Sequence, residues 1–203
     1  MTIKNVEVGH YSIPLPVVLS DSMHGDMASF ELMTARILDD EGREGLGYTY
    51  TLGAGARAIH SVMHSDMAPF LMDRDETRIE EIWHGLWWKL HYAGRGGLVI
   101  HALSAIDIAL WDLLGKRTSL PLWRLLGGAD PKVKAYAGGI DLMFSLDDLL
   151  AQTDQNLSKG FRAIKMKVGR DNLHEDVERI KTMRNHLGSG FPLMVDALSL
   201  IHI

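Results

Sequence analysis

The opening part of the chain alternates between apolar and polar positions in a way that predicts three β-strands in series. We expect an extended N-terminal segment to end at Pro14 and Pro16, because proline removes a hydrogen-bond donor from a strand. Residues 30–38 and 45–51 are the second and third strand candidates, and the acidic turn residues 39–42 separate them. Together these elements predict a β-meander.

The next part of the chain has apolar residues at helical spacing. The three main helix candidates are residues 56–72, 75–92 and 98–114. The third is mostly apolar, so we expect it to be buried, with the carboxylates of Asp107 and Asp112 held by hydrogen bonds. We expect it to end at Gly115, because glycine favours the position that follows a helix.

After Asp130 and Pro131 the pattern changes to strands that alternate with helices. The strand candidates are residues 133–137, 163–168 and 193–196, and the helix candidates are residues 146–157 and 173–187. This alternation predicts parallel strands joined by crossover helices. We therefore expect two domains: an α+β domain of residues 1–130, with a three-stranded meander plus helices, and the first part of an α/β sheet or barrel in residues 131–203.

Composition and charge narrow the range of functions. Lys and Arg number 21 against 26 Asp and Glu, a formal net charge of −5, so the chain lacks the basic surface that nucleic acid needs. The absence of cysteine excludes disulfides and thiolate zinc sites. The N-terminus lacks the apolar core of a secretory signal, and no stretch approaches the roughly 20 apolar residues of a membrane span. We expect a cytoplasmic protein with neither nucleic acid nor a membrane as partner.

Lys165 and Lys167 lie two residues apart on a strand candidate, so their side chains share one face. A solvated strand edge would accommodate both charges. On a buried strand, one lysine could instead act as a base, because a cationic neighbour and scarce water lower its pKa. Asp196 lies at the carboxyl end of the next strand candidate, where it could cap a following helix or hold a hard cation through oxygen.

Four runs of sequence carry a resemblance to a known family. They are residues 102–112 (ALSAIDIALWD), 120–128 (LPLWRLLGG), 160–169 (GFRAIKMKVG) and 192–197 (PLMVDA). The first two are similar to the cap-domain helix, and the segment after it, of the enolase superfamily in its mandelate racemase and muconate lactonizing branch. The third resembles that branch's second barrel strand, with its Lys-x-Lys motif, and the fourth resembles its third strand. The resemblance covers about residues 1–197.

The resemblance implies a fold and a reaction. The fold is an α+β capping domain over residues 1–130, followed by the first part of a TIM-type (β/α) barrel over residues 131–203, truncated after the third strand. The reaction is removal of the proton α to a carboxylate, with Mg²⁺ stabilising the enediolate that results. By motif position, Lys167 would be the base and Asp196 a Mg²⁺ ligand. Lys165 would depress the pKa of Lys167 and face the substrate carboxylate.

The resemblance also implies where substrate specificity resides. Two loops of the cap cover the barrel mouth in this family, and they correspond to residues 20–26 and about 48–55. His24 is the expected substrate contact in the first loop, and Tyr50 is a candidate in the second. Polar loops suit a polyhydroxylated acid, so we expect dehydration of a sugar-derived acid. A racemase or epimerase of a 2-hydroxy acid or similar carboxylate is the alternative, and the full-length parent is expected to be a homo-oligomer.

The chain also departs from the family's pattern near its end. The carboxylate ligands that the family carries on its fourth and fifth barrel strands have no counterpart here, so we expect a fragment with an incomplete Mg²⁺ site and no activity of its own. Residues 198–203 match no barrel turn or helix start of the family. Two other interpretations stay open: a non-catalytic cap module for binding or oligomerisation, and a helical zinc site at His60 and His64.

Overall fold

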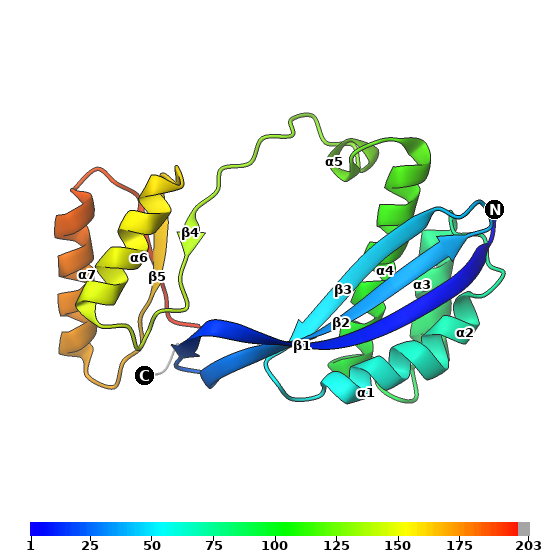
Figure 1. The fold of residues 1–203 in the computed structure, drawn as a ribbon, viewed down its shortest axis with the longest axis horizontal. Coiled ribbons are helices and arrows are strands. Elements are labelled where there is room, and N and C mark those ends of the chain that lie inside the picture. Colours follow the sequence, from blue (N-terminus) through cyan, green and yellow to red (C-terminus); the bar gives the residue numbers. More distant parts are fainter. Residues whose placement is uncertain (199–203) are drawn as a thin grey trace. The chain divides into compact units, whose positions relative to one another are not determined.

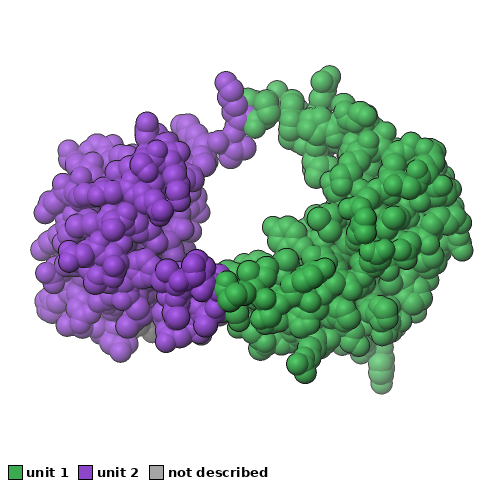
Figure 2. Space-filling model, viewed as in Figure 1, with its two compact units in different colours: residues 1–14, 29–131 green, residues 15–28, 132–203 purple. Residues whose placement is uncertain are grey.

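The computed structural model describes residues 1–198 (Figure 1), so the expectation about the end of the chain falls almost entirely outside the described residues. The chain divides into two compact units (Figure 2). The first unit contains residues 1–14 and 29–131, and the second contains residues 15–28 and 132–203. The hairpin end formed by residues 15–28 therefore belongs to the same compact unit as the later part of the chain.

A three-stranded sheet of β1 (Ile3–Asp21), β2 (Gly25–Asp39) and β3 (Glu44–Thr51) dominates the early part of the chain. The strand order is β1-β2-β3, and β2 pairs antiparallel with β3 from Glu31 opposite Thr51 to Leu38 opposite Glu44. The predicted meander is therefore confirmed.

The predicted end of the first strand is wrong. β1 continues through Pro14 and Pro16 to Asp21, and β2 begins at Gly25, before the expected residue 30. β1 is an edge strand of the sheet, so only one of its sides is paired. An edge strand tolerates proline where the missing N–H would point away from its neighbour. The long hairpin leaves only a short turn at residues 22–24.

Helices follow the sheet in the first unit. They are α1 (Ala56–Ser61), the π-helical η1 (Val62–Met67), α2 (Ala68–Leu71), α3 (Ile79–Lys89), α4 (Leu98–Thr118) and α5 (Leu122–Leu125). The predicted helix of residues 56–72 is thus continuous but π-helical at its centre. The prediction that the long helix ends at Gly115 is wrong: Gly115 is buried inside α4, and Ser119 follows the helix in the left-handed conformation.

The core of the first unit lies between the sheet and its helices, with α4 against one face of the sheet (Figure 1). Its largest fully buried side chains are Ile3, Met33, Ile37, Ile59, Met63, Met67, Leu71, Ile82, Leu86, Leu103, Ile106 and Leu110. The expectation that no stretch approaches a membrane span is wrong for α4, which has the length and hydropathy of one, although half of that window is buried inside the protein. The apolar residues of α4 are therefore explained by the position of this helix in the core of the first unit.

Two glycines and one carboxylate fix β3 against α4. A Cβ atom on Gly47 would lie less than 3.0 Å from the carbonyl oxygen of Ala105, and one on Gly45 would lie equally close to that of Ala109. Real Cβ atoms essentially never show such short contacts. The Asp112 carboxylate accepts a hydrogen bond from the N–H of Leu46 at 2.8 Å, as the sequence predicts for a structural acid.

The sequence predicts a similar arrangement for Asp107, on the same helix as Asp112. Within residues 1–198 the Asp107 carboxylate has no hydrogen bond, so this prediction is wrong for the described part of the chain. Burial raises the pKa of the Asp107 carboxyl group.

The second unit contains a small parallel sheet of β4 (Ala137–Gly138), β5 (Ile164–Lys167) and β6 (Leu193–Asp196), joined by α6 (Leu146–Ser158) and α7 (Leu173–Leu187). β4 is shorter and later than predicted, because residues 133–136 are exposed and lie outside the sheet. The core residues are Ala137, Leu149, Ile164, Met166 and Met183. The predicted fold class, an α+β cap followed by the parallel strand–helix start of a barrel, is confirmed.

Substitution of Gly47 by alanine tests the close approach of β3 to α4. We expect Gly47→Ala to lower the free energy of unfolding of the first unit by about 1–3 kcal/mol, because the new methyl group must displace backbone. Urea unfolding followed by tryptophan fluorescence measures this directly, since all five tryptophans lie in the first unit.

Gly96→Ala is the matched control for this experiment. A Cβ atom at Gly96 would meet nothing within 4 Å, so its effect should stay within about 1 kcal/mol and could be stabilising. Equal effects of the two substitutions would show that the close approach does not constrain the fold.

Candidate active site

Three charged side chains meet at the carboxyl ends of β5 and β6. Lys165 and Lys167 project from the same face of β5, and Lys167 lies directly opposite Asp196 in the parallel register. The Nζ atom of Lys167 lies 2.8 Å from Oδ2 of Asp196, and the Nζ atom of Lys165 lies 3.1 Å from the same oxygen. The structure therefore brings together the two lysines and the aspartate that the sequence singles out.

Burial differs among these three groups. The Lys167 side chain is only 9% exposed, whereas those of Lys165 and Asp196 are 26% and 25% exposed. A buried ammonium group is unfavourable unless a carboxylate pairs with it. Asp196 supplies that charge, which excludes the interpretation of both lysines as a solvated strand edge.

The electrostatics of the cluster favour the charged forms of Asp196 and Lys165. Hydrogen bonds from Lys167, from the N–H of Leu198 and from Lys165 hold the pKa of the Asp196 carboxyl group well below its usual range. The Tyr136 side chain and Asp196 both raise the pKa of Lys165. A general base must offer a free lone pair. Lys165, whose pKa is raised, therefore keeps its proton while it is paired with the Asp196 oxygen.

The loop that carries His24 is ordered by Asp21. The Asp21 carboxylate lies 2.9 Å and 3.0 Å from the Nδ1 atom of His24 and accepts hydrogen bonds from the N–H groups of Met23 and His24. Burial raises the pKa of Asp21, but these hydrogen bonds outweigh it and the net pKa is lowered. The His24 side chain is 49% exposed, so a ring oriented by a carboxylate faces solvent.

Tyr50 lies on β3 in the first unit, whereas the lysines, Asp196 and His24 belong to the second. The Tyr50 side chain is 52% exposed, and its ring centroid lies 5.7 Å from that of Phe30. The Tyr50 ring is therefore packed against Phe30 on one side and exposed on the other, and the exposed side is accessible to a ligand.

Sequence reasoning missed two buried charged residues beside the cluster. Asp141 and Arg179 are 1% and 2% exposed. The Asp141 carboxylate accepts a hydrogen bond from the N–H of Lys167 at 2.8 Å, and the Arg179 guanidinium donates to the Asp141 carbonyl oxygen at 2.9 Å. The available signal was the position of Asp141 just after a strand candidate, where polar groups gather in (β/α) folds.

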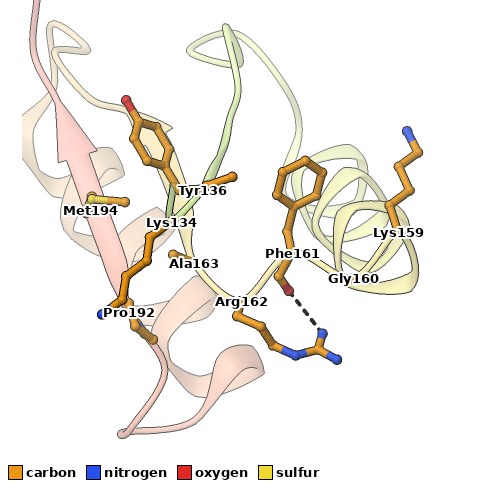
Figure 3. Close-up of a pocket in the computed structure, with 10 residues that line it drawn as sticks. Lys134, Tyr136, Lys159, Gly160, Phe161, Arg162, Ala163, Pro192 and Met194 are labelled. Carbon is orange, nitrogen blue, oxygen red and sulfur yellow. Dashed lines mark hydrogen bonds between the residues drawn. The ribbon is translucent and has the colours of Figure 1, made fainter. Parts of the chain in front are cut away.

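One pocket lies elsewhere on the second unit (Figure 3). It has a volume of about 770 Å³ and is lined mainly by apolar atoms of residues that precede or begin β5 and β6, among them Phe161, Ala163, Pro192 and Met194. The Arg162 guanidinium beside it bonds to the carbonyl oxygen of Phe161. Because catalytic groups of (β/α) folds lie at the carboxyl ends of the strands, this pocket is not the candidate active site.

Sequence comparison identifies the class of protein that this fold and charge cluster define. Residues 4–127 match the N-terminal domain of the mandelate racemase/muconate lactonizing enzyme family, and residues 148–202 match the enolase C-terminal domain-like family. The chain belongs to the mandelate racemase/muconate lactonizing enzyme family.

Particular relatives are similar along almost the whole chain. A 3,6-anhydro-α-L-galactonate cycloisomerase of Streptomyces coelicolor is 55% identical over 195 residues, which are 96% of this chain and 54% of that protein. A solved racemase from S. coelicolor with bound magnesium has a TM-score of 0.94 and 55% identity, with 97% of this chain and 55% of that chain covered.

More distant relatives include dehydratases. The structure of the L-talarate/galactarate dehydratase of Salmonella typhimurium, liganded with Mg and L-lyxarohydroxamate, has a TM-score of 0.91 and 34% identity over 97% of this chain and 51% of that one. The chain thus spans about half the length of the relatives it matches.

Asp196 is the carboxylate of this cluster that bears on a magnesium site. Mg²⁺ requires near-octahedral oxygen coordination, usually with more than one protein carboxylate or with substrate oxygens. Residues 1–198 contain no group of three His, Asp or Glu side chains placed to hold a metal ion, and His60 and His64 belong to no such group in that range. Asp196 offers one carboxylate, whose Oδ2 is bonded to both lysines.

The lowered pKa of Asp196 predicts a pH-dependent contribution to stability. Because its pKa is lower in the folded state, the stabilisation is present above the unfolded pKa of about 3.9 and disappears as the pH falls below it. We expect Asp196→Asn to destabilise the second unit at about pH 7, with a difference from the natural chain that shrinks toward about pH 3.

Thermal unfolding followed by circular dichroism measures this difference, and tryptophan fluorescence reports the first unit separately. Glu178→Gln, which removes an exposed carboxylate on α7, is the control and should change stability little at either pH. If the difference in stability between Asp196→Asn and the natural chain stays constant with pH, the ion-pair assignment is contradicted.

Proposed function

We propose that this chain supplies the proton-abstracting part of a Mg²⁺-dependent enzyme that dehydrates a sugar-derived acid. The observation that carries the proposal is the cluster of Lys165, Lys167 and Asp196 at the carboxyl ends of adjacent parallel strands. Membership of the mandelate racemase/muconate lactonizing enzyme family supports it, and so do relatives that carry the names of acid-sugar dehydratases.

Each residue has a proposed role. Lys167, the most buried of the three charged groups, removes the proton α to the substrate carboxylate at its Nζ atom. Lys165, which is more exposed, pairs with the substrate carboxylate. Asp196 would hold Mg²⁺ through one carboxylate oxygen, and the metal would stabilise the negative charge that develops when the proton is lost. His24 and Tyr50 contact the hydroxyl groups of the substrate.

Cycloisomerisation of an anhydro sugar acid is the second candidate function. It is favoured by the 55% identity to a relative that is named for that reaction. Racemisation or epimerisation remains a further candidate. All three reactions can begin with loss of the proton next to the carboxylate, but their products differ: dehydration releases water, whereas an isomerase conserves the elemental composition of its substrate.

A fusion protein tests the proposed function. Residues 1–197 of this chain would be joined to the remaining barrel of the Streptomyces coelicolor relative, which shares 55% identity with it. We expect the fusion to convert a member of an acid-sugar panel in the presence of Mg²⁺, and Lys167→Met to reduce turnover by at least about 100-fold, because it removes the base. Mass spectrometry of the product separates dehydration from isomerisation.

Two controls accompany the fusion. The 203-residue chain alone should show no turnover, because the proposal assigns only one metal ligand, Asp196, to residues 1–198. Lys159→Met removes a lysine at the end of α6, beside the apolar pocket and away from the carboxyl ends of the strands, and should leave turnover unchanged. Full activity of Lys167→Met, or turnover by the separate chain, would contradict the proposal.

A further inference from the structure

Asp141 occupies an unusual position for a carboxylate. It is 1% exposed, and its Oδ1 atom accepts a hydrogen bond from the backbone N–H of Lys167 at 2.8 Å. Burial raises the pKa of Asp141, while the N–H of Lys167 and the Arg179 guanidinium, 3.8 Å away, stabilise the charged form. The side chain of Asp141 is thus attached to the backbone of the residue that carries the proposed base.

The backbone of Asp141 is attached to a different segment. Asp141 and Ser20 form a parallel β-bridge, although they lie far apart in the sequence. Ser20 is followed by Asp21, whose carboxylate orders the turn and holds the His24 ring. Asp141 therefore contacts two segments. Its backbone pairs with the segment that carries His24, and its side chain bonds to the strand that carries Lys167.

Neighbouring residues fix Asp141 in this place. A Cβ atom on Gly139 would overlap with Oδ2 of Asp141 and with Oε1 of Gln152, so only glycine leaves room for the carboxylate. The Arg179 guanidinium donates hydrogen bonds to the carbonyl oxygens of Asp141, at 2.9 Å, and Phe144, at 2.7 Å. A buried carboxylate that is held from several sides can transmit a small displacement from one attached segment to the other.

We propose that Asp141 is a positioning residue that couples the His24 loop to Lys167 and so sets the spacing between substrate recognition and proton abstraction. The roles of His24 and Lys167 in this statement rest on the proposed function, whereas the coupling itself does not. Proton abstraction is sensitive to this spacing, because a misplacement of about 1 Å can reduce the rate about 100-fold.

Hydrogen–deuterium exchange in the full 203-residue chain tests the coupling without any enzymatic assay. We expect Asp141→Ala to raise exchange by about tenfold or more in both residues 15–28 and residues 160–170. The truncation removes the side-chain bond to the Lys167 N–H, and the backbone of residue 141, no longer held by that bond, pairs less firmly with Ser20. Gly139→Ala should produce the same paired change although Asp141 is intact, since the new methyl group displaces its carboxylate.

Two variants separate positioning from general loss of stability. Asp141→Asn keeps an oxygen acceptor for the Lys167 N–H and should preserve protection in both segments. Thr153→Ala removes a buried hydroxyl that bonds within α6 and contacts Met183, so it weakens the same unit without touching either segment. The proposal would be overturned if Asp141→Ala raised exchange in only one of the two segments. It would also be overturned if Asp141→Asn raised exchange as much as Asp141→Ala, or if Thr153→Ala raised exchange in both segments.

Kinetics of the fusion protein provide the functional measurement. We expect Asp141→Ala to lower kcat about 100-fold and to raise KM, whereas Asp141→Asn should stay within about tenfold of the unmodified fusion. If exchange shows the coupling but kcat and KM of Asp141→Ala are unchanged, the positioning role is wrong. If the unmodified fusion is inactive on every acid, the proposed function fails, and the exchange result alone decides whether the coupling exists.

Discussion

A single carboxylate oxygen shared by two ammonium groups is the interaction on which the chemistry of the second unit depends. Asp196 allows Lys167 to be buried at the end of β5, and it raises the pKa of Lys165 together with Tyr136. The same oxygen favours the protonated form of Lys165. We infer that Asp196 controls the charge state of this face, so that engagement of its oxygen by another cation is what frees a lysine to accept a proton.

The architecture places polar groups from distant parts of the sequence around this face. Strands β1 and β2 lie partly in the first unit, yet the turn between them belongs to the second, where Ser20 bridges Asp141. Asp141 in turn holds the backbone of Lys167. Recognition and proton transfer would thus be linked through backbone contacts and one buried carboxylate, which is a more rigid link than exposed side chains could provide.

The sequence predicts the parts of this arrangement that depend on periodicity and motifs. Alternation indicates the meander and the parallel strands, and the spacing of Lys165 and Lys167 places both on one face. It could not predict that β1 would pass through Pro14 and Pro16, because only sheet order makes β1 an edge strand. Asp141 was missed because its importance arises from tertiary contacts with Ser20 and Lys167, which no local pattern encodes.

Control of this face by Asp196 can be tested by titrating the Lys165 ammonium group with NMR of isotope-labelled lysine, in the natural chain and in Asp196→Asn. We expect a pKa above the ordinary value of about 10.4 in the natural chain. We expect a lower pKa in the variant, where Tyr136 still raises it but Asp196 no longer does. An unchanged Lys165 pKa in Asp196→Asn would show that Asp196 does not control the charge of this face.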